Sequence, residues 1–80
     1  MTDVGQIIWG SGSAWGLGRI VGTDLRVERM RTMDKKLMFL VSDDEYTYLH
    51  CDSQRFETME ELEAGIIEWA VEAGRMMRLH

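Results

Sequence analysis

The sequence of 80 residues predicts an α+β fold, an antiparallel sheet of three or four strands with one long C-terminal helix packed on it. An unbroken apolar run at 37–41 and an alternating, aromatic-rich run at 46–51 predict two strands. The short polar connections around them favour an antiparallel meander. A capped, amphipathic stretch from 58 to 74 predicts the helix. Because a chain this short builds only one core, residues 1–80 are expected to form a single domain.

Upstream of the run at 37–41, the pattern is less regular. Residues 6–9 predict a short strand, and residues 19–30 are extended with alternating character, which predicts another. Between them, residues 10–18 hold four glycines and two serines. Because glycine loses much backbone entropy when it is ordered, this segment is predicted to be a loop. At the other end of the chain, residues 76–79 either add a short edge strand or fray.

The predicted helix has signals at both ends. The Thr58 hydroxyl can accept a hydrogen bond from the third helical N–H while Glu61 reaches back, as in a capping box. Gly74 suits the left-handed residue that ends many helices. Between these caps, one apolar stripe at helical spacing is predicted to face the sheet: Met59, Leu62, Ile66, Trp69, Ala70 and Ala73.

Charge is segregated along the chain. Residues 43–72 hold ten acids and one base, a formal −9, whereas residues 1–42 hold four acids and six bases, a formal +2. The last eight residues add +2, which completes the net charge of −5. A field of one sign attracts oppositely charged partners and repels DNA and anionic bilayers. We therefore expect a basic protein surface as partner, with no direct nucleic-acid or membrane contact.

The carboxylates that could form a partner-binding surface fall into two groups. Glu61, Glu68 and Glu72 lie within about 40° of one another around the predicted helix. The second group lies at the tip of the predicted hairpin and consists of Asp43, Asp44 and Glu45. Two interpretations remain open. The helix acids form either a solvated face that keeps the protein soluble or a negative surface that binds a basic groove.

Some apolar residues fall outside the predicted stripe. Ile67 and Val71 lie one helical turn apart, and either the Trp-containing N-terminal segment covers them or they form an interface with a partner or a second copy. Trp9 precedes the glycine-rich segment and Trp15 lies within it. They are either anchors in the domain or exposed contact residues, since tryptophan is favoured at binding hot spots.

The first half of the chain also carries a basic cluster: Arg26, Arg29, Arg31, Lys35 and Lys36. One interpretation is that these charges protect an edge strand from aggregation. The other is nucleic-acid binding. The net negative charge of the chain and the lack of aromatic residues among these bases argue against the second interpretation.

The sequence contains no catalytic, cofactor or metal signature. The glycines of segment 16–22 resemble a dinucleotide-binding motif only superficially, because no strand–loop–helix unit follows them. His50 and Cys51 point to opposite faces of a strand, so they can neither chelate one ion nor form a nucleophile pair. We therefore expect a non-enzymatic protein without cofactor or metal.

The sequence is typical of a cytoplasmic protein. Its single cysteine fits a reducing compartment, and it shows neither a signal peptide nor an apolar run of about 20 residues. Cys51 itself is a small core residue, a partner in an intermolecular disulfide, or a reactive thiol.

Three features of the second half form a profile: the acidic tip at 43–45, the strand that ends at Cys51–Asp52, and the glutamate-rich helix from Thr58 through Trp69. In this profile the chain resembles the small acidic anti-defence proteins that phages encode, the anti-CRISPR class in particular. Members of that class share no motif that would carry over a binding residue. The resemblance implies stoichiometric inhibition, in which acidic residues occupy a basic surface of a host effector that normally grips nucleic acid.

The sequence thus predicts a non-enzymatic, protein-binding inhibitor. In this hypothesis the acids of the helix and of the hairpin tip steer association, while Ile67, Val71 and Trp15 supply apolar anchors. The alternative is a homo-oligomeric structural or regulatory subunit. Such a subunit would self-associate through Ile67 and Val71, and its acidic face would serve only solubility.

Overall fold

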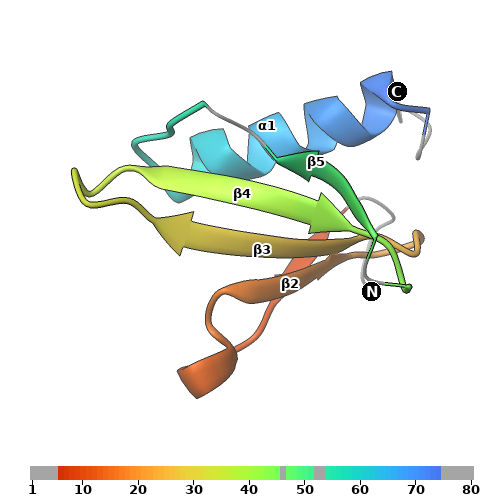
Figure 1. The fold of residues 1–80 in the computed structure, drawn as a ribbon, viewed down its shortest axis with the longest axis horizontal. Helices are drawn as coiled ribbons and strands as arrows, with labels where there is room; N and C mark the ends of the chain where they lie inside the picture. The colour runs from red at the N-terminus through yellow and green to blue at the C-terminus, as the bar shows by residue number, and fades with distance from the viewer. Residues whose placement is uncertain (1–5, 46, 52–53, 75–80) are drawn as a thin grey trace.

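The computed structural model describes residues 6–45, 47–51 and 54–74 and shows one antiparallel sheet of five strands with a single helix packed on it (Figure 1). The elements in chain order are β1 (Ile7–Trp9), β2 (Leu17–Ile20), β3 (Arg26–Arg31), β4 (Leu37–Ser42), β5 (Tyr48–Cys51) and α1 (Met59–Glu72). Each strand pairs with the next, in the spatial order β1-β2-β3-β4-β5. The α+β prediction is confirmed, with five strands instead of three or four.

The extra strand arises because residues 19–30 form two strands and not one. β2 and β3 are joined by a tight turn, in which Gly22 has a φ of 85° and the Thr23 amide donates to the Ile20 carbonyl at 3.2 Å. Leu25 N donates to the Thr23 hydroxyl at 3.1 Å, which fixes the exit of the turn. Glycine adopts a positive φ at no steric cost, so this single residue lets the chain reverse.

The segment 10–18, predicted to be a loop, is more ordered than expected. It contains a 3-10 turn at Gly12–Ala14, and its last two residues begin β2. The Gly10 amide donates to the Leu17 carbonyl at 2.8 Å, which closes the connection between β1 and β2. The loop prediction is confirmed for residues 10–16 and wrong for Leu17 and Gly18, because pairing with β1 and β3 offsets the entropy that glycine loses in a strand.

The basic strand β3 lies in the centre of the sheet, between β2 and β4, so the prediction of a charged edge strand is wrong. Its side chains alternate between two environments. Val27 and Arg29 are buried on the inner face, whereas Arg26 and Glu28 lie on the outer face and are half-buried.

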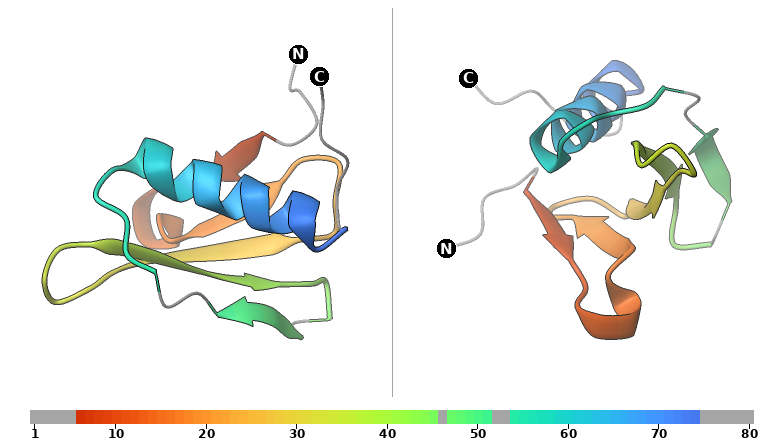
Figure 2. Two further views of the ribbon diagram at one scale, coloured as in Figure 1. Left: turned by 90° about the horizontal axis from the view of Figure 1, so that it is seen from above. Right: turned by 90° about the vertical axis from the view of Figure 1, so that its left-hand side faces the viewer.

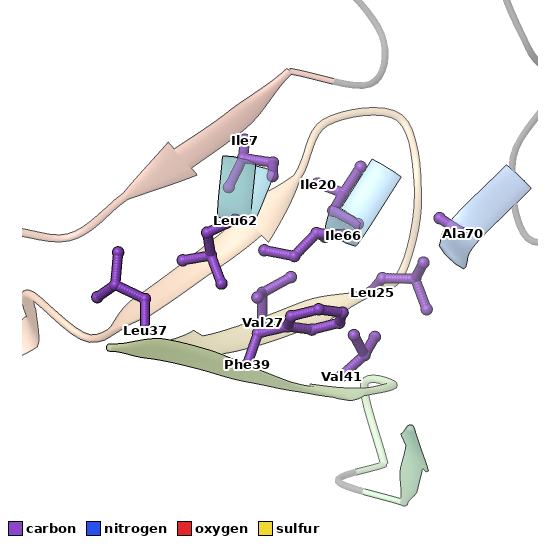
Figure 3. Close-up of a cluster of buried hydrophobic side chains, with 10 residues drawn as sticks. All are labelled: Ile7, Ile20, Leu25, Val27, Leu37, Phe39, Val41, Leu62, Ile66 and Ala70. Atoms are coloured by element: carbon purple, nitrogen blue, oxygen red, sulfur yellow. The ribbon is translucent and has the colours of Figure 1, made fainter. Parts of the chain in front are cut away.

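α1 packs along the inner face of the curved sheet and leaves the other face open (Figure 2). The core lies between the helix and the sheet (Figure 3), and its ten residues come from both layers: Ile7, Ile20, Leu25, Val27, Leu37, Phe39, Val41, Leu62, Ile66 and Ala70. Burying one such large aliphatic or aromatic side chain stabilises the fold by about 1.5–3 kcal/mol. No helix within the described ranges is long and apolar enough to cross a membrane.

Both predicted helix caps form, but Glu61 reaches back to the residue before Thr58 and not to Thr58 itself. The Glu61 amide donates to the Thr58 hydroxyl at 3.1 Å, and the Glu61 carboxylate accepts from the Glu57 amide at 3.2 Å. At the other end, Gly74 has a φ of 73°, and its amide donates to the Val71 carbonyl at 3.0 Å. The predicted strand at 76–79 lies outside the described residues.

Candidate partner-binding surfaces

The predicted helix acids lie on the outward side of α1. Leu62, Ile66 and Ala70 are buried against the sheet, and the residues on the opposite side of the helix are exposed. Four glutamates belong to this exposed side: Glu60, Glu61, Glu68 and Glu72. Within the described part of the chain, none of the four forms an ion pair. We call these four residues the acidic helix face.

Two of the three acids of the hairpin tip, Asp43 and Asp44, form contacts within the fold, whereas Glu45 is exposed. The Asp43 carboxylate accepts from the Glu45 amide at 3.0 Å and from the Thr47 amide at 2.9 Å, so it stabilises the turn between β4 and β5. Asp44 lies 3.3 Å from Arg26 Nε and 3.7 Å from Arg19 Nη2. These arginines lie on the outer face of the sheet, so the Asp44 carboxylate is not part of the acidic helix face.

Of the predicted apolar anchors on the helix, Ile67 packs against the core cluster and Val71 is half-buried. β1 lies close to the same side of α1, because Trp9 Nε1 donates to the Glu63 carboxylate at 3.0 Å. The Trp-containing N-terminal segment therefore contacts the helix at Glu63. Ile67 contributes to the stability of the monomer.

Trp15 stacks on a buried arginine. The Arg29 guanidinium lies 3.9 Å from the centre of the Trp15 ring and 4.3 Å from that of Trp9. Its Nε donates to the Trp15 carbonyl at 3.0 Å, and its Nη1 contacts the Met59 sulfur at 3.0 Å. Burial lowers the pKa of Arg29 from its ordinary value, and the nearby Glu63 carboxylate opposes that effect. Trp15 is thus an anchor of its loop, yet 41% of its surface remains exposed.

The outer face of the sheet carries a concave surface that the sequence analysis missed. A pocket of about 450 Å³ opens there, over β1, β2 and β3. Three large apolar side chains in it are unusually exposed: Ile8 at 51%, Leu17 at 56% and Tyr48 at 68%. The sequence held a signal for this surface, because Ile8 and Leu17 point to the face of the β1–β2 pair opposite to that of the core residues Ile7 and Ile20. It was hidden because the two strands were not recognised as partners.

Strand register places two arginines side by side in this pocket. One row of cross-strand neighbours runs over all five strands: Ile8, Arg19, Arg26, Ser42 and Tyr48. Like charges directly opposite each other destabilise an antiparallel pair. Asp44 offsets this repulsion, because its carboxylate contacts both guanidinium groups.

His50, for which the sequence predicts no metal site, lies close to two aromatic rings. His50 lies 5.2 Å from Phe39 and 5.0 Å from Trp69, measured between ring centroids. Among the residues that the structure describes, no group of His, Cys, Asp and Glu side chains could hold a metal ion. The side chain of Cys51 and residue Asp52 lie outside the described set.

Comparisons of the chain with protein-family models, with curated proteins and with solved structures found no match. The candidate surfaces therefore rest on their own geometry.

Proposed function

We propose that this chain is a non-enzymatic protein-binding inhibitor that occupies a basic surface of its partner with the acidic helix face. The observation that carries the proposal is the exposure of Glu60, Glu61, Glu68 and Glu72 without an ion pair in the described part of the chain. The partner surface that best matches the acidic helix face is one that normally binds nucleic acid, because it presents lysine and arginine along a groove. The resemblance to phage anti-defence proteins supports the same class of partner.

The rigidity of α1 supports this function. Its N-terminal cap and its three buried residues fix the rotation of the helix, so the outward glutamates keep their relative positions. Glu68 and Glu72 are one turn apart and lie on the same side, which suits two adjacent cationic groups. Preorganised charges cost little conformational entropy when a partner docks.

Apolar contact is still needed for affinity, since exposed charges mainly raise the association rate. Val71 lies between Glu68 and Glu72 in the sequence and is half-buried, so part of its surface remains available. Trp15 offers a second partly exposed surface, on the loop that Arg29 anchors. Ile67 contributes less than expected, because it packs against the core.

The test begins with tagged protein, which captures candidate partners from a host lysate for identification by mass spectrometry. Association of the purified partner is then measured by surface plasmon resonance with wild type and with the variant Glu68→Lys/Glu72→Lys. We expect a slower association for the variant, and for the wild type a loss of rate between about 50 and 500 mM salt as the exposed charges become screened.

A matched control separates local from global charge. The variant Asp24→Lys/Glu28→Lys changes the net charge by the same amount, but its substitutions lie on the β2–β3 turn and the outer face of the sheet. Circular dichroism verifies that both variants are folded. Equal association rates for wild type and Glu68→Lys/Glu72→Lys at low salt would contradict the proposal, and so would equal slowing of both variants.

A further inference from the structure

We propose that the concave outer face of the sheet binds a small amphipathic carboxylate, whose charged group takes the place that Asp44 occupies in the free protein. The ligand would have an aromatic or branched aliphatic body and one carboxylate. This site is separate from the acidic helix face, because α1 covers the other side of the sheet (Figure 2).

The anion position is set by strand register. Arg19 in β2 lies directly opposite Arg26 in β3, so two guanidinium groups point into the same region of the outer face. Asp44 reaches both of them from the β4–β5 turn, at 3.7 and 3.3 Å. Arginine pairs recognise carboxylates through their planar, fork-like donors. Asp44 thus marks where a carboxylate is stabilised.

Exchange of one carboxylate for another is feasible at this position. The side chains of Arg19, Arg26 and Asp44 are 59%, 40% and 51% exposed. Ion pairs with such exposure contribute little to stability, because water screens them. A ligand that brings its own carboxylate restores the contacts that Asp44 gives up, so the exchange costs little.

The gain in binding comes from apolar contact beside the arginines. Ile8, Leu17 and Tyr48 line the same pocket and are more than half exposed in the free protein. The pocket volume of about 450 Å³ falls in the range of about 300–1,000 Å³ that is typical of small-molecule sites. An apolar body seated there is removed from water together with the three side chains.

Shape and charge favour a small ligand over larger occupants. A two-fold dimer would place this surface against its own copy, and two hollows facing each other cannot pack closely. Nucleic acid would have to approach a chain with a net charge of −5. A small monoanion meets less long-range repulsion and can fill the hollow.

The probe is 2-naphthoate, and its uncharged counterpart 2-naphthamide has nearly the same shape. Titrations of the full chain are followed by calorimetry and by amide chemical shifts in NMR. We expect naphthoate to bind about tenfold more tightly than naphthamide, because only the carboxylate forms charge-assisted hydrogen bonds. The largest shift changes are expected at residues of β2 and β3 near the pocket.

Variants identify the anion position. Arg19→Gln should weaken naphthoate binding about tenfold, whereas Arg31→Gln, an exposed arginine outside the pocket, should leave it unchanged. Asp44→Asn should tighten binding about two- to fivefold, because it removes the competing carboxylate. Glu45→Gln removes a charge from the same turn without a contact to these arginines and should have a smaller effect.

The outcome that overturns the proposal is equal affinity for naphthoate and naphthamide, or weaker binding by Asp44→Asn. A dimer in sedimentation equilibrium that prevents probe binding would also overturn it, since the surface would then serve a second copy. If Arg19→Gln does not fold, Leu17→Ser tests the apolar half of the site instead and should also weaken naphthoate. Glu68→Lys/Glu72→Lys should retain probe binding, so this result is independent of the proposed function.

Discussion

A methyl group added at position 18 should destabilise the fold, although replacing glycine in a strand usually helps. Gly18 lies directly opposite Trp9 in the β1–β2 pair. A Cβ atom at position 18 would lie 2.6 Å from Trp9 Cε3 and 2.9 Å from Trp9 Cζ3, well inside van der Waals contact. The indole cannot easily move away, because its Nε1 donates to Glu63 and the Arg29 guanidinium lies 4.3 Å from its ring centre.

The magnitude follows from three effects on the free energy of unfolding. Gly18→Ala gains about 0.4–1 kcal/mol by reducing the entropy of the unfolded chain. Crowding against Trp9 costs about 1–3 kcal/mol. Displacing the indole also weakens its hydrogen bond to the Glu63 carboxylate, and bonds to charged groups contribute about 1.5–3 kcal/mol. With partial loss of that bond, we expect a net destabilisation of about 2 kcal/mol.

For a domain of this size, about 2 kcal/mol lowers the midpoint of thermal unfolding by about 8–16 °C. Urea titrations followed by circular dichroism measure the free energy directly. The control is the same substitution in a Trp9→Leu background, where the ring is absent and Gly18→Ala should be neutral or stabilising. A stabilising effect of Gly18→Ala in the wild-type background would refute the argument, because it would mean that Trp9 can move at no cost.

Two further predictions concern the helix and the segment that leads into it. Gly65→Ala should destabilise the fold by about 1 kcal/mol instead of gaining the helix propensity of alanine, because its Cβ would lie 2.8 Å from Phe56 Cζ. The control is Ala64→Gly, which measures the same alanine–glycine difference at the exposed neighbouring position. A higher urea midpoint for Gly65→Ala would contradict the reasoning. The hydrogen bond between Lys36 and Glu57 lowers the pKa of Glu57 below its ordinary 4.5, so its stabilisation is present at neutral pH and is lost as pH falls through the lowered pKa. The same bond raises the pKa of Lys36 above 10.5, so the stabilisation persists below pH 10.5 and is lost as pH rises through the raised value. Lys36→Met should therefore flatten the thermal midpoint against pH at both ends, and an unchanged profile would exclude this pair as a cause.

The parts of the fold that depend on local signals could be predicted from the sequence. Thr58 and Gly74 define the helix ends because capping uses residues within one turn of each end. The rotation of the helix follows from its apolar stripe, so the exposure of Glu61, Glu68 and Glu72 was also predictable. The exposure of these glutamates could be predicted without knowing the contacts made by distant parts of the chain.

The first thirty residues could not be predicted in the same way. The turn at Gly22 separates two short apolar runs that together imitate one strand. Gly18 favours a loop by its own entropy, and only the Trp9 ring across the strand pair explains its place in β2. The Arg19–Arg26 neighbourhood depends on that same pairing, so the outer pocket could not be recognised before the register was known.

In this protein, the distribution of charge along the sequence differs from the distribution of available charge in the folded structure. Asp44 and Glu57, from the acidic half, form ion pairs with bases of the first half, and Glu63 accepts a hydrogen bond from Trp9. These contacts divide the acidic run into residues that are paired within the fold and residues that remain available, Glu68 and Glu72 among them. A partner with a basic surface would therefore find Glu68 and Glu72 available on the helix, whereas Asp44 at the hairpin tip already contacts two arginines. Because the arginine-rich pocket lies on the other side of the sheet, an anionic ligand and a cationic partner could bind without competing for the same residues.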